Sequence, residues 1–252
     1  MRSTDDLRQW WLDDLSRMLT RPEMWATDGR AMDTLCWMRL RDLCFLDDRD
    51  TERDQTVELL RRYGKLGVSG PFTTIFGKER TCTAEVASVH AEHFHRLGYL
   101  TVDRHLSPNE SAALDGSQLR EWVGKRDLRR SEVEATFGPP SLVIAHRILC
   151  YTPADASGWV FFDCWDEQPR RYVPGEGTYT ADRETDPLVR SVRVPAADFE
   201  DGLILTLYGR VLRWGPEWWI HHPGDDATDE AQAIAAQLRH IEQVDPSQRS
   251  DR

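Results

Sequence analysis

The spacing of hydrophobic residues predicts helices throughout the first half of the chain. Apolar side chains recur there three and four positions apart, which places them on one face of a helix. The first predicted helix begins at Ser3 or Thr4, either of which can cap it, and ends before Pro22. Further helices are predicted over residues 30–46, 51–63, 83–97 and 107–123, the last of them broken near Asp115-Gly116. Two short runs, 72–76 and 99–102, are rich in residues that favour strands.

The pattern changes near residue 126, and most of the elements predicted after it are strands. A short helix is predicted over residues 131–136, a long loop over 166–186 and an amphipathic helix over 228–244. The predicted strands are 142–151, 159–165, 188–194, 203–208 and 211–214. Gly209 and Arg210 suit a type II′ turn between the last two strands. Connections of this hairpin type imply an antiparallel sheet.

These elements predict an α+β protein, in which a helical N-terminal region is followed by an antiparallel β-sheet region with a C-terminal helix. A chain of 252 residues is long enough for one large domain or two ordinary ones. The change of pattern predicts a mainly helical domain over 1–125 and an α+β sheet domain over 126–223. Residues 224–252 are predicted to hold the amphipathic helix and a frayed tail.

Composition and charge narrow the functional classes. The chain is 40% hydrophobic, contains ten tryptophans and carries a net charge of −11, which disfavours nucleic acid and anionic membranes as partners. Its five scattered cysteines include no CxxC pair, so neither a disulfide framework nor a zinc ribbon is expected. The first residues lack the apolar core of a signal peptide, and no apolar run is as long as a membrane span. We therefore expect a cytoplasmic protein.

The predicted strand 159–165 holds an acid among aromatic residues. Side chains alternate along a strand, so four of its residues share one side, while the other side is apolar as well. Aromatic side chains often anchor protein interfaces, and three tryptophans near residue 216 could extend such a patch. The predicted partner-binding residues are Trp159, Phe161, Asp163, Trp165, Trp214, Trp218 and Trp219. In the alternative, the N-terminal helices or the 228–244 helix cover this side, and Asp163 pairs with an arginine.

The helix predicted over 83–97 carries the only arrangement typical of a metal site. Cys82, His90 and His93 share one of its faces, and histidines three positions apart can reach one ion. A further ligand and a signature such as HExxH are missing, so packing in a core is the favoured interpretation. We predict no metal site and no cofactor, and keep the three residues as weak candidates. The sequence also lacks a GxSxG nucleophile elbow and a phosphate-binding GxxxxGK[ST] loop, so no catalytic residue can be named.

Two segments resemble known folds. The helix that ends in Leu97-Gly98-Tyr99-Leu100 resembles the transition from helix to wing in winged-helix domains, over about residues 51–102. The run from Arg130 through Phe137-Gly138-Pro139-Pro140 to residue 165 resembles the helix and hairpin of SmpA/OmlA and β-lactamase-inhibitor-like modules. The second resemblance implies a small α+β architecture whose sheet engages a protein. It carries no activity, because the chain shows neither the export signal nor the disulfide pattern of those modules.

The leading hypothesis is a non-catalytic protein-binding protein, such as an immunity, antitoxin-like or regulatory factor. Its acidic charge would accelerate association with a basic protein partner. The first alternative is a metal-dependent enzyme centred on His90 and His93. The second is a winged-helix-type regulator, although the expected recognition helix exposes few of the side chains that contact bases.

Overall fold

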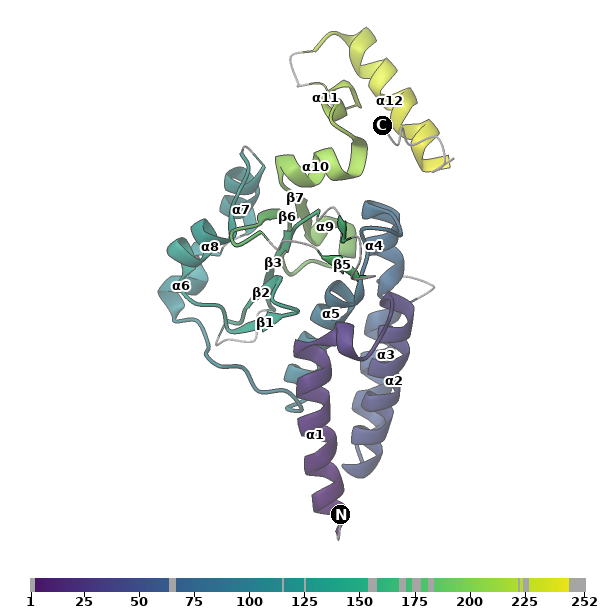
Figure 1. Ribbon diagram of the computed structural model, residues 1–252, viewed down its shortest axis with the longest axis vertical. Coiled ribbons are helices and arrows are strands. Elements are labelled where there is room, and N and C mark those ends of the chain that lie inside the picture. Colours follow the sequence, from purple (N-terminus) through teal and green to yellow (C-terminus); the bar gives the residue numbers. More distant parts are fainter. Residues whose placement is uncertain are drawn as a thin grey trace.

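The computed structural model of the chain describes residues 3–63, 67–114, 116–124, 126–153, 158–167, 171–173, 178–180, 184–221, 223 and 227–244. Helices come first along the chain, a five-stranded antiparallel sheet follows, and a helix stands at the C-terminal end (Figure 1). The predicted α+β class is confirmed. Within the described residues, no helix is both long and apolar enough to cross a membrane.

The predicted N-terminal helices form within one or two residues of their expected bounds. They are α1 (Thr4–Thr20), α2 (Gly29–Leu46), α3 (Asp50–Arg61) and α5 (Thr83–Arg96). A short 3₁₀ helix, η1 (Pro22–Met24), connects α1 to α2. Polar caps explain where helices begin, because the Ser3 hydroxyl accepts from the Asp6 N–H and the Asp28 carboxylate from the Ala31 N–H. The segment predicted over 107–123 divides into α6 (Pro108–Ala113) and α7 (Gly116–Val123).

The main sheet has the strand order β1-β2-β3-β6-β7, and every neighbouring pair is antiparallel. Its strands are β1 (Leu142–Ile144), β2 (Ile148–Tyr151), β3 (Val160–Trp165), β6 (Leu188–Arg193) and β7 (Leu203–Leu205). The predicted strand 142–151 is therefore a hairpin, turned by Ala145 and His146 with φ of 53° and 56°. The predicted loop 166–186 contains a separate two-stranded sheet, β4 (Arg171–Val173) with β5 (Thr178–Thr180).

Helices cover both faces of the main sheet. Phe161 points into a core shared with α1, α2 and α5, and Phe162 points into a second core shared with α7 and α8 (Arg130–Phe137). This three-layer arrangement explains why both sides of β3 are apolar. Each core combines residues from the two predicted domains, 1–125 and 126–223.

Three predicted strands are wrong. Residues 211–214 belong to α10 (Leu207–Trp214), which the Thr206 hydroxyl caps by accepting from the Gly209 N–H. Gly209 is needed for packing rather than for a turn, since a Cβ there would meet the Arg190 carbonyl oxygen at 1.8 Å. The run 72–76 lies in α4 (Ser69–Phe76), and residues 99–102 form no strand, so the wing implied by the winged-helix resemblance does not follow α5.

The C-terminal helix α12 (Asp229–Val244) lies beside α11 (Trp218–His221), away from the main sheet (Figure 1). It begins within one residue of the predicted 228–244 helix. The aromatic side of β3 is covered by α5 rather than by α12. Among the described residues, none of α12 belongs to either core.

Candidate functional site

The aromatic side of β3, predicted to bind a partner, faces the underside of α5. Trp159 and Phe161 are only 4% and 2% exposed, and Asp163 is buried as well. The Trp159 ring lies 5.2 Å from the His95 ring of α5, and its backbone N–H donates to Glu92 on the same helix. Trp165 is half-buried at the end of the strand. A partner could reach this side only if α5 moved, so its role in binding stays a prediction.

The three tryptophans expected to extend that patch belong to other helices. Trp214 is half-buried at the end of α10, where it packs against the main core. Trp218 is half-buried in α11, with the Arg210 guanidinium 5.1 Å from its ring. The Trp219 side chain lies outside the described part of the structure.

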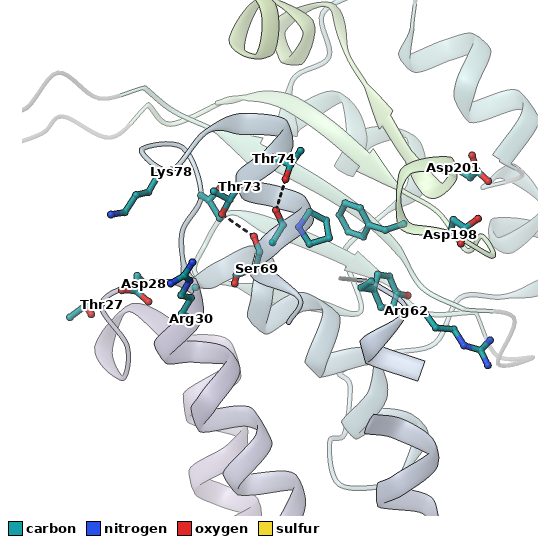
Figure 2. A pocket seen from close by; sticks show the side chains of 16 residues that line it. Thr27, Asp28, Arg30, Arg62, Ser69, Thr73, Thr74, Lys78, Asp198 and Asp201 are labelled. Carbon is teal, nitrogen blue, oxygen red and sulfur yellow. Dashed lines mark hydrogen bonds between the residues drawn. The ribbon is translucent and has the colours of Figure 1, made fainter. Parts of the chain in front are cut away.

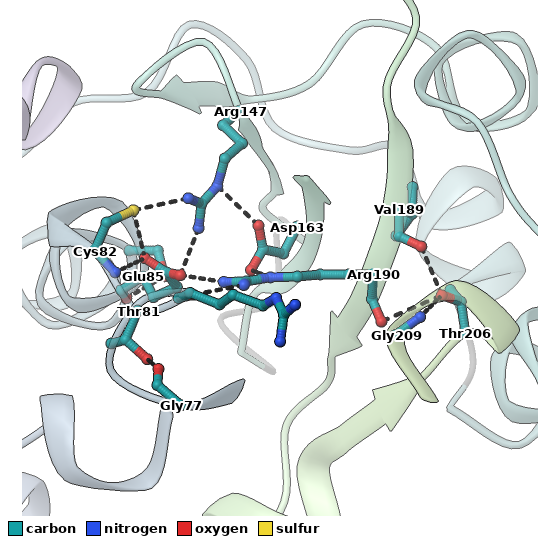
Figure 3. A network of polar contacts seen from close by, with 12 residues as sticks. Gly77, Thr81, Cys82, Glu85, Arg147, Asp163, Val189, Arg190, Thr206 and Gly209 are labelled. Carbon is teal, nitrogen blue, oxygen red and sulfur yellow. Dashed lines mark hydrogen bonds and ion pairs between the residues drawn. The ribbon is translucent and has the colours of Figure 1, made fainter. Parts of the chain in front are cut away.

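A network of buried charges joins α5 to the sheet (Figure 3). Arg190 of β6 is fully buried, and its Nε donates to Asp163 Oδ2 at 2.8 Å while its Nη2 contacts Glu85 Oε1. Arg147 meets the same two acids, with Nε 3.0 Å from Asp163 Oδ1 and Nη2 2.6 Å from Glu85 Oε1. Two carboxylates are thus matched by two guanidinium groups, an arrangement that limits the cost of burying them.

The thiol of Cys82 completes this network at the first turn of α5. Its Sγ lies 2.7 Å from Arg147 Nη1 and 3.1 Å from Glu85 Oε2. Burial raises the pKa of this thiol to about 12, and the Glu85 carboxylate adds to the rise against the opposing Arg147. A thiol with so high a pKa stays protonated at neutral pH and is a poor nucleophile.

Glu85 itself stays ionised despite its complete burial. Burial alone would raise the pKa of its carboxyl group, but Arg147 and Arg190 outweigh that effect and lower it. The Arg190 guanidinium also stacks on aromatic rings, 4.1 Å from Trp165 and 4.0 Å from Phe76. The network is therefore a closed set of paired groups that holds α5 on the sheet, without the accessible nucleophile and base of an active site.

The three metal candidates have separate surroundings. Cys82 belongs to the network above, whereas His90 Nε2 lies 2.9 Å from Asp33 Oδ1. His93 is buried with its Nε2 unpartnered, and burial lowers its pKa to about 3. Among the described residues, no group of three or more His, Cys, Asp or Glu side chains could hold a metal ion. The metal hypothesis therefore gains no support.

The described structure contains an open groove where the helical part meets the far edge of the sheet (Figure 2). It has a volume of about 1120 Å³ and lies between the start of α2, the end of α3, α4 and α9 (Phe199–Gly202). The lining residues are Thr27, Asp28, Gly29, Arg30, Arg62, Tyr63, Ser69, Gly70, Pro71, Thr73, Thr74, Lys78, Thr81, Asp198, Phe199 and Asp201. We call it the α4 groove.

Buried groups fix the α4 wall of the groove. The Ser69 N–H, at the start of α4, donates to Asp33 Oδ2 at 3.1 Å, and Asp33 is held in turn by His90. Gly29 allows α2 to approach, because a Cβ there would lie 3.0 Å from the Ser69 Cβ. Sequence reasoning missed this site because its residues come from four distant segments, and none of those segments holds a recognised motif.

Compared with family models, curated proteins and solved structures, the chain matches none. The two resemblances seen in the sequence are thus limited to local architecture. A helix, α8, does precede an antiparallel hairpin in the segment similar to SmpA/OmlA modules, but the winged-helix-like segment lacks its wing. The function must therefore be argued from the surfaces of the molecule itself.

Proposed function

We propose that this chain is a non-catalytic protein-binding protein that binds a basic partner where α1 begins and α2 ends. The observation that supports this most is the exposure of Phe45, which is 71% exposed near the end of α2. Met38 is 47% exposed and lies seven residues earlier, on the same face of the helix. Large apolar side chains on one exposed face are typical of interaction surfaces.

A third large exposed apolar residue lies on the neighbouring helix. Arg8 of α1 donates to both carboxylate oxygens of Asp47, so the first turns of α1 lie along the end of α2. Trp10, two residues further along α1, is 44% exposed. Figure 1 shows these helix ends far from the sheet, where a partner can approach.

The charge around Phe45 indicates which kind of partner would fit. Residues 41–54, here called the acidic tip, contain six carboxylates and three arginines. Asp48, Asp50 and Asp54 are exposed, and the last two pair with Arg53. A basic surface with an apolar pocket would complement this region, and the net charge of −11 would accelerate the encounter.

In its finer form, the proposal is an immunity, antitoxin-like or regulatory protein that neutralises a basic protein in the cytoplasm. The cysteines support that compartment, because Cys36, Cys44, Cys82, Cys150 and Cys164 are all free thiols. The acidic charge works equally against the winged-helix alternative, in which the chain would have to bind a polyanion.

Site-specific photo-crosslinking in the native host tests this proposal. A photoreactive phenylalanine analogue at position 45 is expected to cross-link one basic protein. The same analogue at position 24 is the matched control, since Met24 is 73% exposed but lies in η1 rather than in the acidic tip. Equal products from both positions, or an acidic product, would contradict the proposal.

The purified partner then provides the quantitative test. Its affinity for the Phe45→Ser/Met38→Ser variant should fall at least about tenfold, which corresponds to about 1.4 kcal/mol. Both residues are exposed, so the variant should keep the circular dichroism spectrum and unfolding midpoint of the parent chain. Affinity should also fall as salt rises from 50 to 500 mM. An unchanged affinity in a folded variant would overturn the proposal.

A further inference from the structure

The charges that line the α4 groove are not paired with one another. Arg30, Arg62 and Lys78 make no ion pair with any described residue, and the same holds for Asp198 and Asp201. Charged side chains of both signs thus surround one groove of about 1120 Å³ without pairing with one another. Two sets of separated charges can each accept a group of opposite sign from a ligand.

The groove has a charge direction. Figure 2 shows Arg30, Lys78 and Asp28 toward one end, and Asp198, Asp201 and Arg62 toward the other, with Ser69 and α4 between them. The first end thus holds one more positive than negative side chain, and its Asp28 caps α2, while the second holds one more negative than positive side chain. A ligand that fits this pattern carries an anionic group at one end and a cationic group at the other. A simple anion would meet Asp198 and Asp201, and a simple cation would meet Arg30 and Lys78.

The wall between the two ends can accept hydrogen bonds. The hydroxyl groups of Thr73 and Thr81 each donate to a backbone carbonyl four residues earlier, at 2.9 and 2.8 Å. Their protons are used in this way, so the hydroxyls offer lone pairs to the groove. Such a wall complements N–H donors, which recur along a peptide backbone.

An aromatic group forms the apolar part of the lining. The Phe199 ring packs edge to face on Tyr63 at 5.7 Å and on Phe72 at 4.8 Å. Pro71 adds further apolar surface on α4. An extended ligand can therefore place apolar atoms in the middle of the groove and its charged groups at the ends.

We propose that the α4 groove binds an extended peptide segment, with a carboxylate directed to Arg30 and Lys78 and a basic side chain directed to Asp198 and Asp201. This site lies at the start of α2, whereas the acidic tip lies at the end of the same helix. The inference therefore goes beyond the proposed function and does not depend on it.

Titration of the full ¹⁵N-labelled chain with capped peptides tests the proposal. The dipolar probes are acetyl-Lys-(Ala)n-Asp-amide peptides with one to four alanines, and the single-charge probes replace either Lys or Asp with Ala. At least one dipolar peptide should bind at least about tenfold more tightly than both single-charge peptides. Its amide shifts should map to α4 and to residues 198–202. Shifts that map elsewhere, or no saturation at 10 mM peptide, would overturn the proposal.

Paired variants assign the two ends. Asp198→Asn/Asp201→Asn should weaken the Lys-only peptide and leave the Asp-only peptide unchanged, while Arg30→Gln/Lys78→Gln should do the reverse. The matched controls are Glu23→Gln/Glu58→Gln and Arg17→Gln/Arg21→Gln, since these exposed charges lie outside both the groove and the acidic tip. Equal effects of each variant on both peptides would contradict the proposed orientation of the ligand in the groove. Free L-lysine that bound as tightly as the best peptide would indicate a small zwitterion and overturn the peptide assignment.

Discussion

Two regions that combine opposite charges differ in what those charges contact. Between α5 and the sheet, Glu85 and Asp163 are buried and matched by Arg147 and Arg190. In the α4 groove, the charged side chains are exposed, and Arg30 is one of those without an ion pair among the described residues. A buried charge needs an oppositely charged partner because it has lost its hydration, whereas an exposed charge stays hydrated without one and can bind a ligand.

This difference separates structural charges from candidate binding charges. Exchange of a groove charge for a neutral side chain removes nothing that the fold requires. Removal of one partner from the buried network leaves its opposite uncompensated in the interior. The number of charged residues in a region therefore indicates less about function than their burial and pairing do.

The largest expected effect is the loss of stability in Glu85→Ala. This change leaves the guanidinium groups of Arg147 and Arg190 with only Asp163 between them, so the free energy of unfolding should fall by about 3–5 kcal/mol. Urea denaturation followed by circular dichroism measures it. Glu58→Ala is the control, since the Glu58–Arg61 pair is exposed and should contribute less than about 1 kcal/mol. Similar losses in both variants would erase the contrast between buried and exposed charges.

A second effect concerns the pH dependence of the buried layer. The pKa of His93 is lowered to about 3, chiefly by burial and further by the neighbouring side chains His90, Arg96 and Arg193. Below pH 6.5 the unfolded chain binds a proton there that the folded chain does not, so stability falls with decreasing pH. Between pH 6.5 and about 3, this group should remove about 1.4 kcal/mol per pH unit.

The substitution His93→Leu isolates that contribution. It removes a buried Nε2 without a partner, so the variant should be at least as stable as the parent and should lose less stability between pH 6.5 and 4.5. Urea denaturation at several pH values gives the two slopes. His105→Gln is the control because His105 is exposed, and it should leave the slope unchanged. Identical slopes in His93→Leu and the parent chain would show that another group titrates.

The sequence predicted α1, α2, α5 and α6 well because each carries its own local signals, whereas it predicted strands within α4 and α10. Ser3 and Ser107 cap helices through side chains near in sequence, and apolar spacing marks the inner faces of α2 and α5. The predicted strand 211–214 failed because Gly209 resembles a turn residue locally. Its actual role is to let α10 approach the Arg190 carbonyl, a contact nineteen positions away in sequence.

The candidate surfaces were harder to predict because they too depend on contacts between residues that are distant in sequence. Alternation correctly gathered Trp159, Phe161 and Asp163 on one side of β3, but it could not show that α5 covers that side. The arginine that pairs with Asp163 was expected only as an alternative, and neither Arg147 nor Arg190 was named. The α4 groove joins residues from Arg30 to Asp201, and such long-range assembly leaves no period or spacing in the sequence.

The smallest expected effect completes the contrast between the two regions. Arg30→Gln/Lys78→Gln and Asp198→Asn/Asp201→Asn should each change the free energy of unfolding by less than about 0.5 kcal/mol for each substituted residue. These side chains are exposed and, among the residues that the structure describes, make no ion pair that the change would break. Urea denaturation without added peptide measures the effect. A loss of several kcal/mol would mean that the groove charges support the fold, as Glu85 does, and would withdraw the main reason to regard them as a binding site.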